Sequence, residues 1–289
     1  MRALPASVDA VVTFFNEGTA AIRKTLEALL RQERPFSTIF LVDDGSTDPV
    51  ATGVFGEYPN VQWLHNEVNM GISFSRNRVI QLSTAEYIAC INIDVILHPR
   101  WTTELIRLLE QDPGIGCVFS RMEPEKNNLL SAWRFRFHEQ KYNLPSGEVK
   151  FAPGHAVLFR RCELLSAGAY NPALKRVGED YDISLRLQKS GLNTWYCNKS
   201  LSVSIQQDTL ANLSRKQMVR ITGNNLETMT GEVFFRRSFR IFLSRVMRNL
   251  GKGRLLFLPI DVIVFVRGFN YFKKAKEKLK FNNPVTVCS

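Results

Sequence analysis

The chain has 289 residues, a formal net charge of +11 and an apolar fraction of 45%, which fits one large α/β domain with an appendage. No apolar signal-peptide core precedes the first predicted strand, and the five cysteines are scattered without a CxxC pair. These features argue against a disulfide framework, and we expect a reduced, cytoplasmic protein.

The first 120 residues alternate strand-like and helical patterns. Apolar, β-branched runs predict strands at 8–15, 38–42, 61–65, 90–95 and 115–120. This alternation predicts a mostly parallel sheet with right-handed crossovers. No GxGxxG follows the first strand and no GxxxxGK[ST] occurs, which argues against a nicotinamide-binding Rossmann domain and a P-loop nucleotidase.

Two predicted strands run into carboxylates. Asp43 and Asp44 follow the strand at 38–42 and precede a short helix, and Asp94 ends the strand at 90–95. Ligands of open α/β sheets bind at the carboxyl ends of the strands. Asp94 is therefore a candidate ligand for a metal or a phosphate-bearing substrate, and the acidic pair can bind a base or ribose. Turn and cap chemistry accounts for the same residues, so both alternatives stay open.

Residues 66–75 form a polar, glycine-bearing loop before a helix that carries Arg76. Helix N-terminal amides and a guanidinium both favour anions, so Arg76 is a candidate contact for a diphosphate. The alternative is a solvated surface arginine.

Residues 127–142 are rich in Trp, Phe and Arg and are predicted to form a loop or an irregular helix. Trp133 either packs in the core, which we favour, or stacks on the ring of a bound ligand. A strand at 156–160 and a short helix at 161–168 follow. Three acids then open an amphipathic helix near residue 178, where acids also oppose the helix dipole. Two short edge strands are expected at 194–197 and 201–205.

Four of these features resemble family 2 glycosyltransferases in order and approximate spacing. They are LVDDGSTD at 41–48, the NxGxSxxRN run at 69–77, the strand that ends at Asp94, and GEDYDISLRLQKSG at 178–191. The resemblance covers residues 8–210. It implies the GT-A fold, an α/β architecture with a Rossmann-like, mostly parallel sheet flanked by helices. A catalytic domain at 1–210 and a helical C-terminal extension at 211–289 are then expected.

The resemblance also implies an enzyme that transfers a sugar from a nucleotide-diphosphate donor with inversion. Asp43 and Asp44 resemble the contacts to base and ribose, and Asp94 resembles the last acid of a DxD motif that binds Mg²⁺ or Mn²⁺. Asp180 resembles the catalytic base. The further donor-binding candidates are Phe15, Glu17, Arg76 and Asn92. The acceptor and supporting candidates are Glu179, Gly154, His155, Trp133 and Arg186.

Two residues depart from the family pattern. Asn92 replaces the first acid of the DxD motif, and Ser204 stands where many relatives carry a metal-binding histidine. Both put metal affinity in question and motivate an alternative, a catalytically impaired nucleotide-binding or scaffold protein. A nucleotidyltransferase is disfavoured because no glycine-rich phosphate loop follows the first strand.

From residue 210 onward helices are expected. Residues 234–280 hold 13 Lys or Arg against two acids, so the net charge belongs to this segment alone. Pro259 and Asp261 interrupt its apolar runs, which fall short of the roughly 20 residues that a spanning helix needs. We expect 234–280 to contact an anionic membrane surface, in preference to a solvated basic face, and no nucleic acid is expected. The expected partners are a nucleotide-sugar donor and a glycan or lipid-linked acceptor, at the inner face of the membrane, in surface polysaccharide assembly.

Overall fold

The computed structural model describes residues 6–48, 58–125, 128–142, 145–174, 177–223 and 225–282. The chain divides into two compact units, one formed by 1–125 and 137–206 and the other by 126–136 and 207–289. Residues 126–136, expected in the catalytic domain, thus group with the C-terminal segment. The short helix expected after the acidic turn lies outside the described residues.

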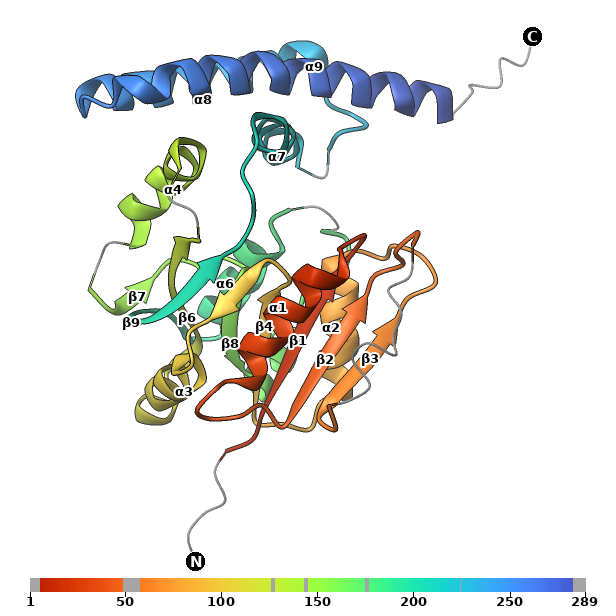
Figure 1. Ribbon diagram of the computed structural model, residues 1–289, viewed down its shortest axis with the longest axis vertical. Helices are drawn as coiled ribbons and strands as arrows, with labels where there is room; N and C mark the ends of the chain where they lie inside the picture. Colours follow the sequence, from red (N-terminus) through yellow and green to blue (C-terminus); the bar gives the residue numbers. More distant parts are fainter. Residues whose placement is uncertain are drawn as a thin grey trace, which may run out of the picture. The chain divides into compact units, whose positions relative to one another are not determined.

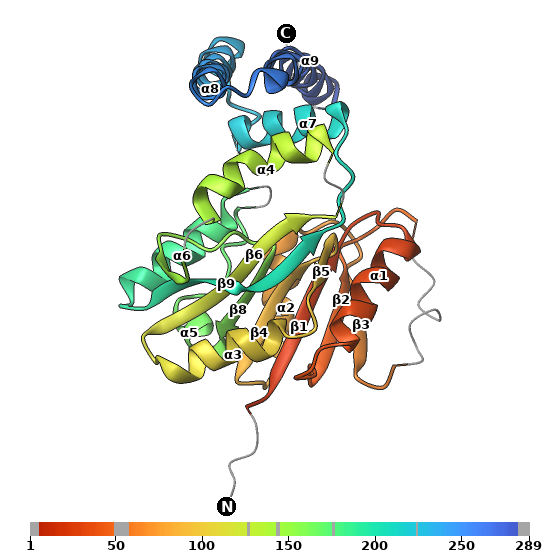
Figure 2. The same cartoon turned by 60° about the vertical axis from the view of Figure 1, so that its left-hand side comes forward.

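The first unit is built on one mixed sheet (Figures 1 and 2). The order of its strands is β3-β2-β1-β4-β8-β6-β9-β5, and β7 also pairs with β9. The strands are β1 (Val8–Phe14), β2 (Thr38–Asp43), β3 (Val61–His65), β4 (Tyr87–Asn92), β5 (Val95–Leu97), β6 (Ile115–Pro124), β7 (Gly147–Val149), β8 (Ala156–Arg160) and β9 (Asn193–Ser204). The four N-terminal strands β1 to β4 are parallel, as the sequence predicts, whereas β8 is antiparallel to both of its neighbours.

Helices cover both faces of this sheet. They are α1 (Thr19–Leu30), α2 (Ile72–Leu82), α3 (Trp101–Gln111), α5 (Arg161–Ser166) and α6 (Glu179–Lys189). Along β1, Val8, Ala10 and Val12 pack with α1 and α3, whereas Val11 packs with α2 and α6 on the opposite face. Because both faces are buried, β1 reads in sequence as a continuous apolar run.

Two expected strands differ in the structure. The strand expected at 90–95 ends at Asn92, and Val95 opens β5, which runs antiparallel to β9. Asp94 therefore lies in a turn between two strands of the sheet. The two short strands expected at 194–197 and 201–205 are one strand, β9, which lies inside the sheet next to β6. An irregularity in the β6–β9 pairing between Cys197 and Leu201 accommodates the polar residues that separate the two runs.

The second unit is helical. Its helices are α7 (Leu210–Thr222), α8 (Gly231–Gly251), the short 3₁₀ helix η2 (Leu255–Phe257) and α9 (Leu258–Asn282), together with the first half of α4 (Leu129–Tyr142). A capping box between Thr209 and Asn212 starts α7. Two apolar clusters hold the unit together, one around Phe234 and Phe272 and the other around Trp133 and Val264.

By length and composition, one helix in the described part of the chain could cross a membrane, at Leu255–Leu279. The expectation that no apolar stretch here is long enough was wrong on this criterion. It counted uninterrupted apolar runs, whereas a helix can carry Pro259 and Asp261 and still have a high mean hydropathy.

Candidate active site

An open pocket of about 340 Å³ lies at the carboxyl ends of β1 and β4, within the size range of small-molecule sites. It is lined by Thr13, Phe14, Phe15, Glu17, Asp44, Asn69, Gly71, Ile72, Asn92, Ile93 and Asp94. The Phe15 ring is 43% exposed, so it offers an apolar face at the pocket. Among the described residues Thr13 Oγ1 is buried without a hydrogen-bond partner, and a ligand in the pocket could satisfy it.

Only some of the donor-binding residues that the sequence suggested line this pocket. Phe15, Glu17, Asp44, Asn92 and Asp94 line it, although they come from three separate stretches of the chain. Two other candidates, Asp43 and Arg76, do not line it, and both are buried.

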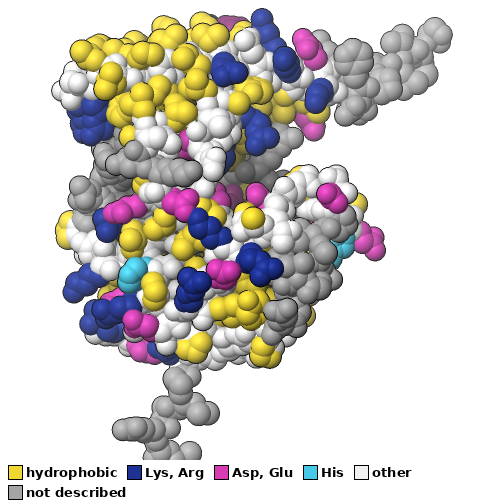
Figure 3. All heavy atoms as spheres, viewed as in Figure 1, with side chains coloured by type: hydrophobic (Ala, Val, Ile, Leu, Met, Phe, Trp, Pro, Cys, Tyr) yellow, Lys and Arg dark blue, Asp and Glu magenta, His cyan; other side chains and the backbone are white. Residues whose placement is uncertain are grey.

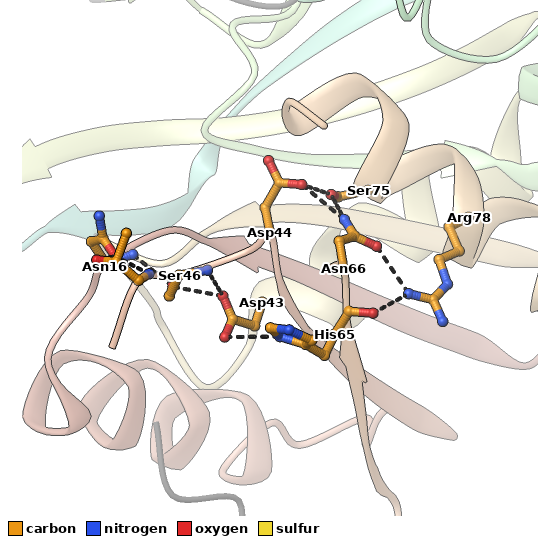
Figure 4. A network of polar contacts seen from close by, with 9 residues as sticks. Asn16, Asp43, Asp44, Ser46, His65, Asn66, Ser75 and Arg78 are labelled. Atoms are coloured by element: carbon orange, nitrogen blue, oxygen red, sulfur yellow. Dashed lines mark hydrogen bonds and ion pairs between the residues drawn. The ribbon is translucent and has the colours of Figure 1, made fainter. Parts of the chain in front are cut away.

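Asp44 organises the wall of the pocket through its carboxylate. Oδ1 accepts hydrogen bonds from Asn66 Nδ2 at 2.8 Å and from Ser75 Oγ at 2.8 Å (Figure 4). Oδ1 also accepts one from the Met70 amide at 3.1 Å, and Oδ2 accepts one from the Gly71 amide at 2.8 Å. The carboxylate thereby ties the end of β2 to the start of α2.

Asp43 has an internal role. Its Oδ1 accepts from the Ser46 amide at 3.0 Å and from Ser46 Oγ at 2.6 Å, and its Oδ2 lies 3.3 Å from His65 Nδ1 (Figure 4). Asp43 is 1% exposed, and its expected contact with a base or ribose stays a prediction. Its hydrogen bonds to Ser46 are those of the turn alternative that the sequence left open.

Asn16 lies between the pocket-lining residues Phe15 and Glu17 and was not singled out from the sequence. Its backbone is left-handed, with φ 55°, and its Oδ1 accepts hydrogen bonds from the Thr47 amide at 2.9 Å and Thr47 Oγ1 at 3.0 Å. Asparagine is among the few residues that visit this conformation readily, which is a sequence signal in its favour. Asn16 thus joins the loop of Phe15 and Glu17 to the acidic turn.

Arg76 is fully buried and connects separate parts of the site. Its Nη2 donates to Asn92 Oδ1 at 2.9 Å and to the Gly154 carbonyl at 2.8 Å, and its guanidinium lies 5.2 Å from the centre of the Tyr170 ring. Within the described residues its Nε and Nη1 have no hydrogen-bond partner.

Arg76 is 0% exposed, so this structure does not present its side chain at the pocket surface, and the expected diphosphate contact stays a prediction. The physical reason is that α2 starts at Ile72, so Arg76 lies one turn inside the helix and not at its amide-rich end. Burial lowers the pKa of Arg76, but Tyr170, Cys90, Glu179 and Asp180 raise it, and the net shift is upward. The guanidinium thus stays charged in the interior.

The other residues of the NxGxSxxRN run anchor a distant segment. Ser73 Oγ donates to the Leu174 carbonyl at 3.3 Å. Asn77 exchanges two hydrogen bonds with the backbone of Tyr170, at 2.6 and 2.9 Å. The motif on α2 therefore holds the segment at 170–174, which lies shortly before the acids of α6.

Gly154 joins Arg76 to the acids at the start of α6. Its amide donates to Asp180 Oδ2 at 3.1 Å. A Cβ at this position would lie 3.3 Å from Asp180 Cβ, 3.4 Å from Arg76 Nη1 and 3.5 Å from Glu179 Oε1. Burial raises the pKa of Glu179, Arg76 lowers it, and the charge of Asp180 raises it. A continuous chain of contacts thus runs from Asn92 through Arg76 and Gly154 to Asp180.

The remaining acceptor and supporting candidates, His155, Arg186 and Trp133, lie in three different parts of the structure. The His155 carbonyl accepts a hydrogen bond from the Asn92 amide at 2.8 Å, so His155 supports the end of β4. Arg186 donates from Nε and Nη2 to Asp182 Oδ2 at 3.0 and 2.6 Å, and also to the Ala167 carbonyl. Trp133 is 4% exposed in the core of the second unit, where the packing alternative describes it.

Asp94 is the candidate ligand for a divalent metal, and both departures from the family pattern lie beside it. Asn92 is two residues before it, and Ser204 pairs with its neighbour Val95 across β5 and β9. No group of three or more His, Cys, Asp or Glu among the described residues could enclose a metal. One partly exposed carboxylate fits a metal that takes its other ligands from phosphates and water, as Mg²⁺ commonly does.

Known proteins resemble this chain in sequence. A family model described as Glycosyl transferase family 2 matches residues 9–164. A Drosophila melanogaster protein named putative polypeptide N-acetylgalactosaminyltransferase 13 is 25% identical over 232 residues, which is 69% of this chain and 40% of that protein. Glucosyl-dolichyl phosphate glucuronosyltransferase of Haloferax volcanii is 25% identical over 180 residues, covering 59% of this chain and 58% of the relative. The chain spans about half the length of the curated relatives it matches.

Solved structures share the fold. The mannosyltransferase PcManGT from Pyrobaculum calidifontis in complex with GDP-Man and Mn²⁺ matches with a TM-score of 0.61 at 15% identity, covering 98% of this chain and 82% of that chain. GalNAc-T7 with UDP, GalNAc and Mn²⁺ matches with a TM-score of 0.60 at 17% identity, covering 70% of this chain and 44% of that chain. At these identities the likeness concerns the GT-A fold alone. The family model matches more than half of the sequence, including the acidic turn, the α2 motif and Asp94, and the chain therefore belongs to glycosyl transferase family 2.

Proposed function

We propose that this protein is an inverting, metal-dependent glycosyltransferase that transfers a sugar from a nucleotide-diphosphate sugar to a hydroxyl of a glycan or lipid-linked acceptor. The observation that carries the proposal is the chain of contacts from Asn92, beside Asp94, through Arg76 and Gly154 to Asp180. It couples the candidate donor pocket to the candidate base within one unit of the fold. Three of the relatives are named as sugar transferases, which supports the same reaction class.

The pocket suits a nucleotide. The exposed Phe15 ring offers a stacking face for a base, and Thr13 Oγ1 and the Glu17 carboxylate offer polar contacts beside it. Asp94 would hold Mg²⁺ or Mn²⁺, which supplies charge neutralisation for the leaving diphosphate. The similar structures that contain UDP or GDP-Man together with Mn²⁺ support this assignment.

Asp180 is the proposed base. The Gly154 amide orients its Oδ2, and the Tyr181 amide holds its Oδ1 at 2.8 Å. In the proposed step the acceptor oxygen forms a bond to the anomeric carbon while the bond from that carbon to the diphosphate oxygen breaks. The acceptor proton passes to Asp180, and the electron pair leaves with the diphosphate. One displacement inverts the anomeric centre.

A donor panel tests the function. Thermal shifts with a set of nucleotide-diphosphate sugars and Mn²⁺ identify the donor, because a bound ligand stabilises the fold by mass action. Transfer from that donor to added acceptors, with inversion read by NMR, is the expected result. Release of the nucleotide without any metal requirement would contradict the metal assignment.

A second candidate is a catalytically impaired, nucleotide-binding relative. The observation in its favour is that Asn92 and Ser204 both flank Asp94, and neither adds a carboxylate or an imidazole beside it. Thermal shifts with nucleotides, without turnover of any donor, would support it. For the enzyme we propose a place at the cytoplasmic face of a membrane, in surface polysaccharide or glycoconjugate assembly.

A further inference from the structure

The helices α8 and α9 expose a row of large apolar side chains. On α8, residues recur every three or four positions with exposed fractions of 44% to 63%, namely Phe235, Phe239, Leu243, Met247 and Leu250. On η2 and α9 the exposed residues are Leu255, Leu256, Val262 and Val266, with fractions of 47% to 76%. Figure 3 shows hydrophobic side chains gathered over these helices. We call these nine residues the apolar stripe.

The two helices present the apolar stripe as one surface. Phe265 of α9 packs against Phe235, Phe239 and Phe242 of α8, with ring centroids 6.0, 6.3 and 5.0 Å apart. Phe269 lies 6.1 Å from Phe235. Because these aromatic contacts close the seam between α8 and α9, the stripe is a continuous face and not two separate rows.

Basic side chains accompany the apolar stripe. The exposed ones among the described residues of this segment are Arg236, Arg237, Arg240, Arg248, Lys252, Arg267, Lys273, Lys274 and Lys278. The segment 234–280 holds 13 bases and two acids. A positive, aromatic-rich amphipathic surface matches the interface of an anionic bilayer, where rings enter the acyl boundary and cations meet headgroups. A second copy of this chain would carry the same positive charge and would be repelled.

The opposite face of α9 packs against other helices of the second unit. Asp261, which is 2% exposed, accepts hydrogen bonds from Trp133 Nε1 at 3.0 Å and from Asn249 Nδ2 at 2.6 Å. Ile260 and Val264 pack in the same cluster as Trp133. If α9 crossed a bilayer, these partners would have to separate or enter the hydrocarbon together, and a charged group there is costly.

We propose that the apolar stripe inserts into the surface of an anionic lipid bilayer, and that α9 lies along the interface instead of crossing the membrane. The use of such a surface rests on the proposed function, a transferase that meets a lipid-linked acceptor. Binding itself does not depend on transfer. A vesicle assay and a transfer assay therefore fail independently.

The first experiment compares full-length variants on vesicles of phosphatidylcholine with and without phosphatidylglycerol. Leu243→Ser, Met247→Ser and Leu256→Ser are combined, because these side chains are 48%, 63% and 76% exposed and lie outside the apolar clusters of the unit. We expect wild-type protein to sediment with the anionic vesicles and the triple variant to partition at least about tenfold more weakly. Leu82→Ser, at a 56% exposed position of the first unit, is the control and should bind like wild type.

A second pair of variants separates charge from hydrophobicity. Arg237→Glu with Arg240→Glu reverses two exposed charges on α8, and Arg23→Glu with Lys199→Glu reverses two on the first unit. Only the α8 pair should weaken binding to anionic vesicles by more than about tenfold at low salt. Equal binding by both pairs, or unchanged binding by the serine triple variant, would overturn the proposal.

Two further experiments test the orientation of α9 in the membrane and the alternative that a second copy of the chain covers the apolar stripe. A protein that lies along the interface is released from vesicles by alkaline carbonate, whereas retention would overturn the in-plane arrangement of α9. Light scattering without lipid measures self-association. A dimer that the serine triple variant converts to monomer, with no change in vesicle binding, would assign the stripe to a second copy and refute membrane insertion.

Discussion

The Arg76 guanidinium donates from Nη2 to the side-chain oxygen of Asn92 at 2.9 Å, so a fully buried cation faces a neutral amide at the position where a DxD motif has its first acid. The same Nη2 reaches the carbonyl of Gly154, whose amide holds Asp180. One buried arginine therefore connects the end of β4, two residues before Asp94, to the helix that carries Asp180. We regard Arg76 as a positioning residue for both.

Replacing Asn92 by aspartate should stabilise the fold. The variant gives Arg76 a carboxylate partner in place of an amide, and a hydrogen bond between charged groups is worth about 1 kcal/mol more than a neutral one. We expect Asn92→Asp to raise the free energy of unfolding in urea by about 1 kcal/mol. A second acid near Asp94 should also lower the Mn²⁺ concentration at half-maximal activity. A loss of stability would show that the Arg76–Asn92 contact is not as described.

Variants of Asp94 and Asp180 should distinguish metal-dependent donor binding from the chemical step. Asp94→Ala is expected to abolish the Mn²⁺-dependent part of the thermal shift with donor. Asp180→Asn should keep that shift but lower kcat by about 10²- to 10⁴-fold, the usual contribution of a general base.

Asp182→Asn is the control for Asp180, because Asp182 lies in the same first turn of α6 but bonds to Arg186. It should retain most of the activity and lose some stability. If Asp94→Ala and Asp180→Asn both transferred sugar at the wild-type rate, the proposed assignment of the site would be refuted.

Gly154→Ala tests the positioning of Asp180. The added methyl would lie 3.3 Å from Asp180 Cβ and 3.4 Å from Arg76 Nη1, which is closer than most real contacts of this kind. We expect kcat to fall by about tenfold or more while the KM for donor changes little, because a small displacement of a base affects the rate directly. Gly147→Ala, where a Cβ meets nothing within 4 Å, should leave kcat unchanged.

Glu179 should make stability depend on pH. Burial raises the pKa of Glu179 in the folded state above its unfolded value, so folding favours the protonated form. The protonated Glu179 contributes fully to the free energy of unfolding when the pH is below the pKa of the unfolded chain, about 4.3. This contribution is lost as the pH rises through the higher pKa of the folded state. Urea unfolding across this range should show a smaller loss of stability with rising pH for Glu179→Gln than for wild type. Parallel curves for the two proteins would contradict the shift.

The sequence alone determined the parallel part of the sheet and the positions of its acids. The runs that form β1, β2 and β4 are apolar because both of their faces are buried. Asp44 directly follows β2 and Asp94 lies two residues after β4, so their places could be read from local pattern. The ordered motifs indicated the family for the same reason, since each motif sits at a strand end or a helix start.

Only the tertiary structure decided what the side chains touch. Asp43 and Arg76 look like surface ligands in sequence, but packing buries both, because α2 starts one turn before Arg76 and Ser46 folds back on Asp43. Arg76 contacts Asn92, which is 16 positions away in sequence, and Gly154, which is 78 positions away. No local sequence pattern encodes such contacts. The exposed face of α8 and α9 likewise depends on which residues Trp133 and its neighbours cover, so hydropathy predicts an apolar segment but only packing leaves one side of it uncovered.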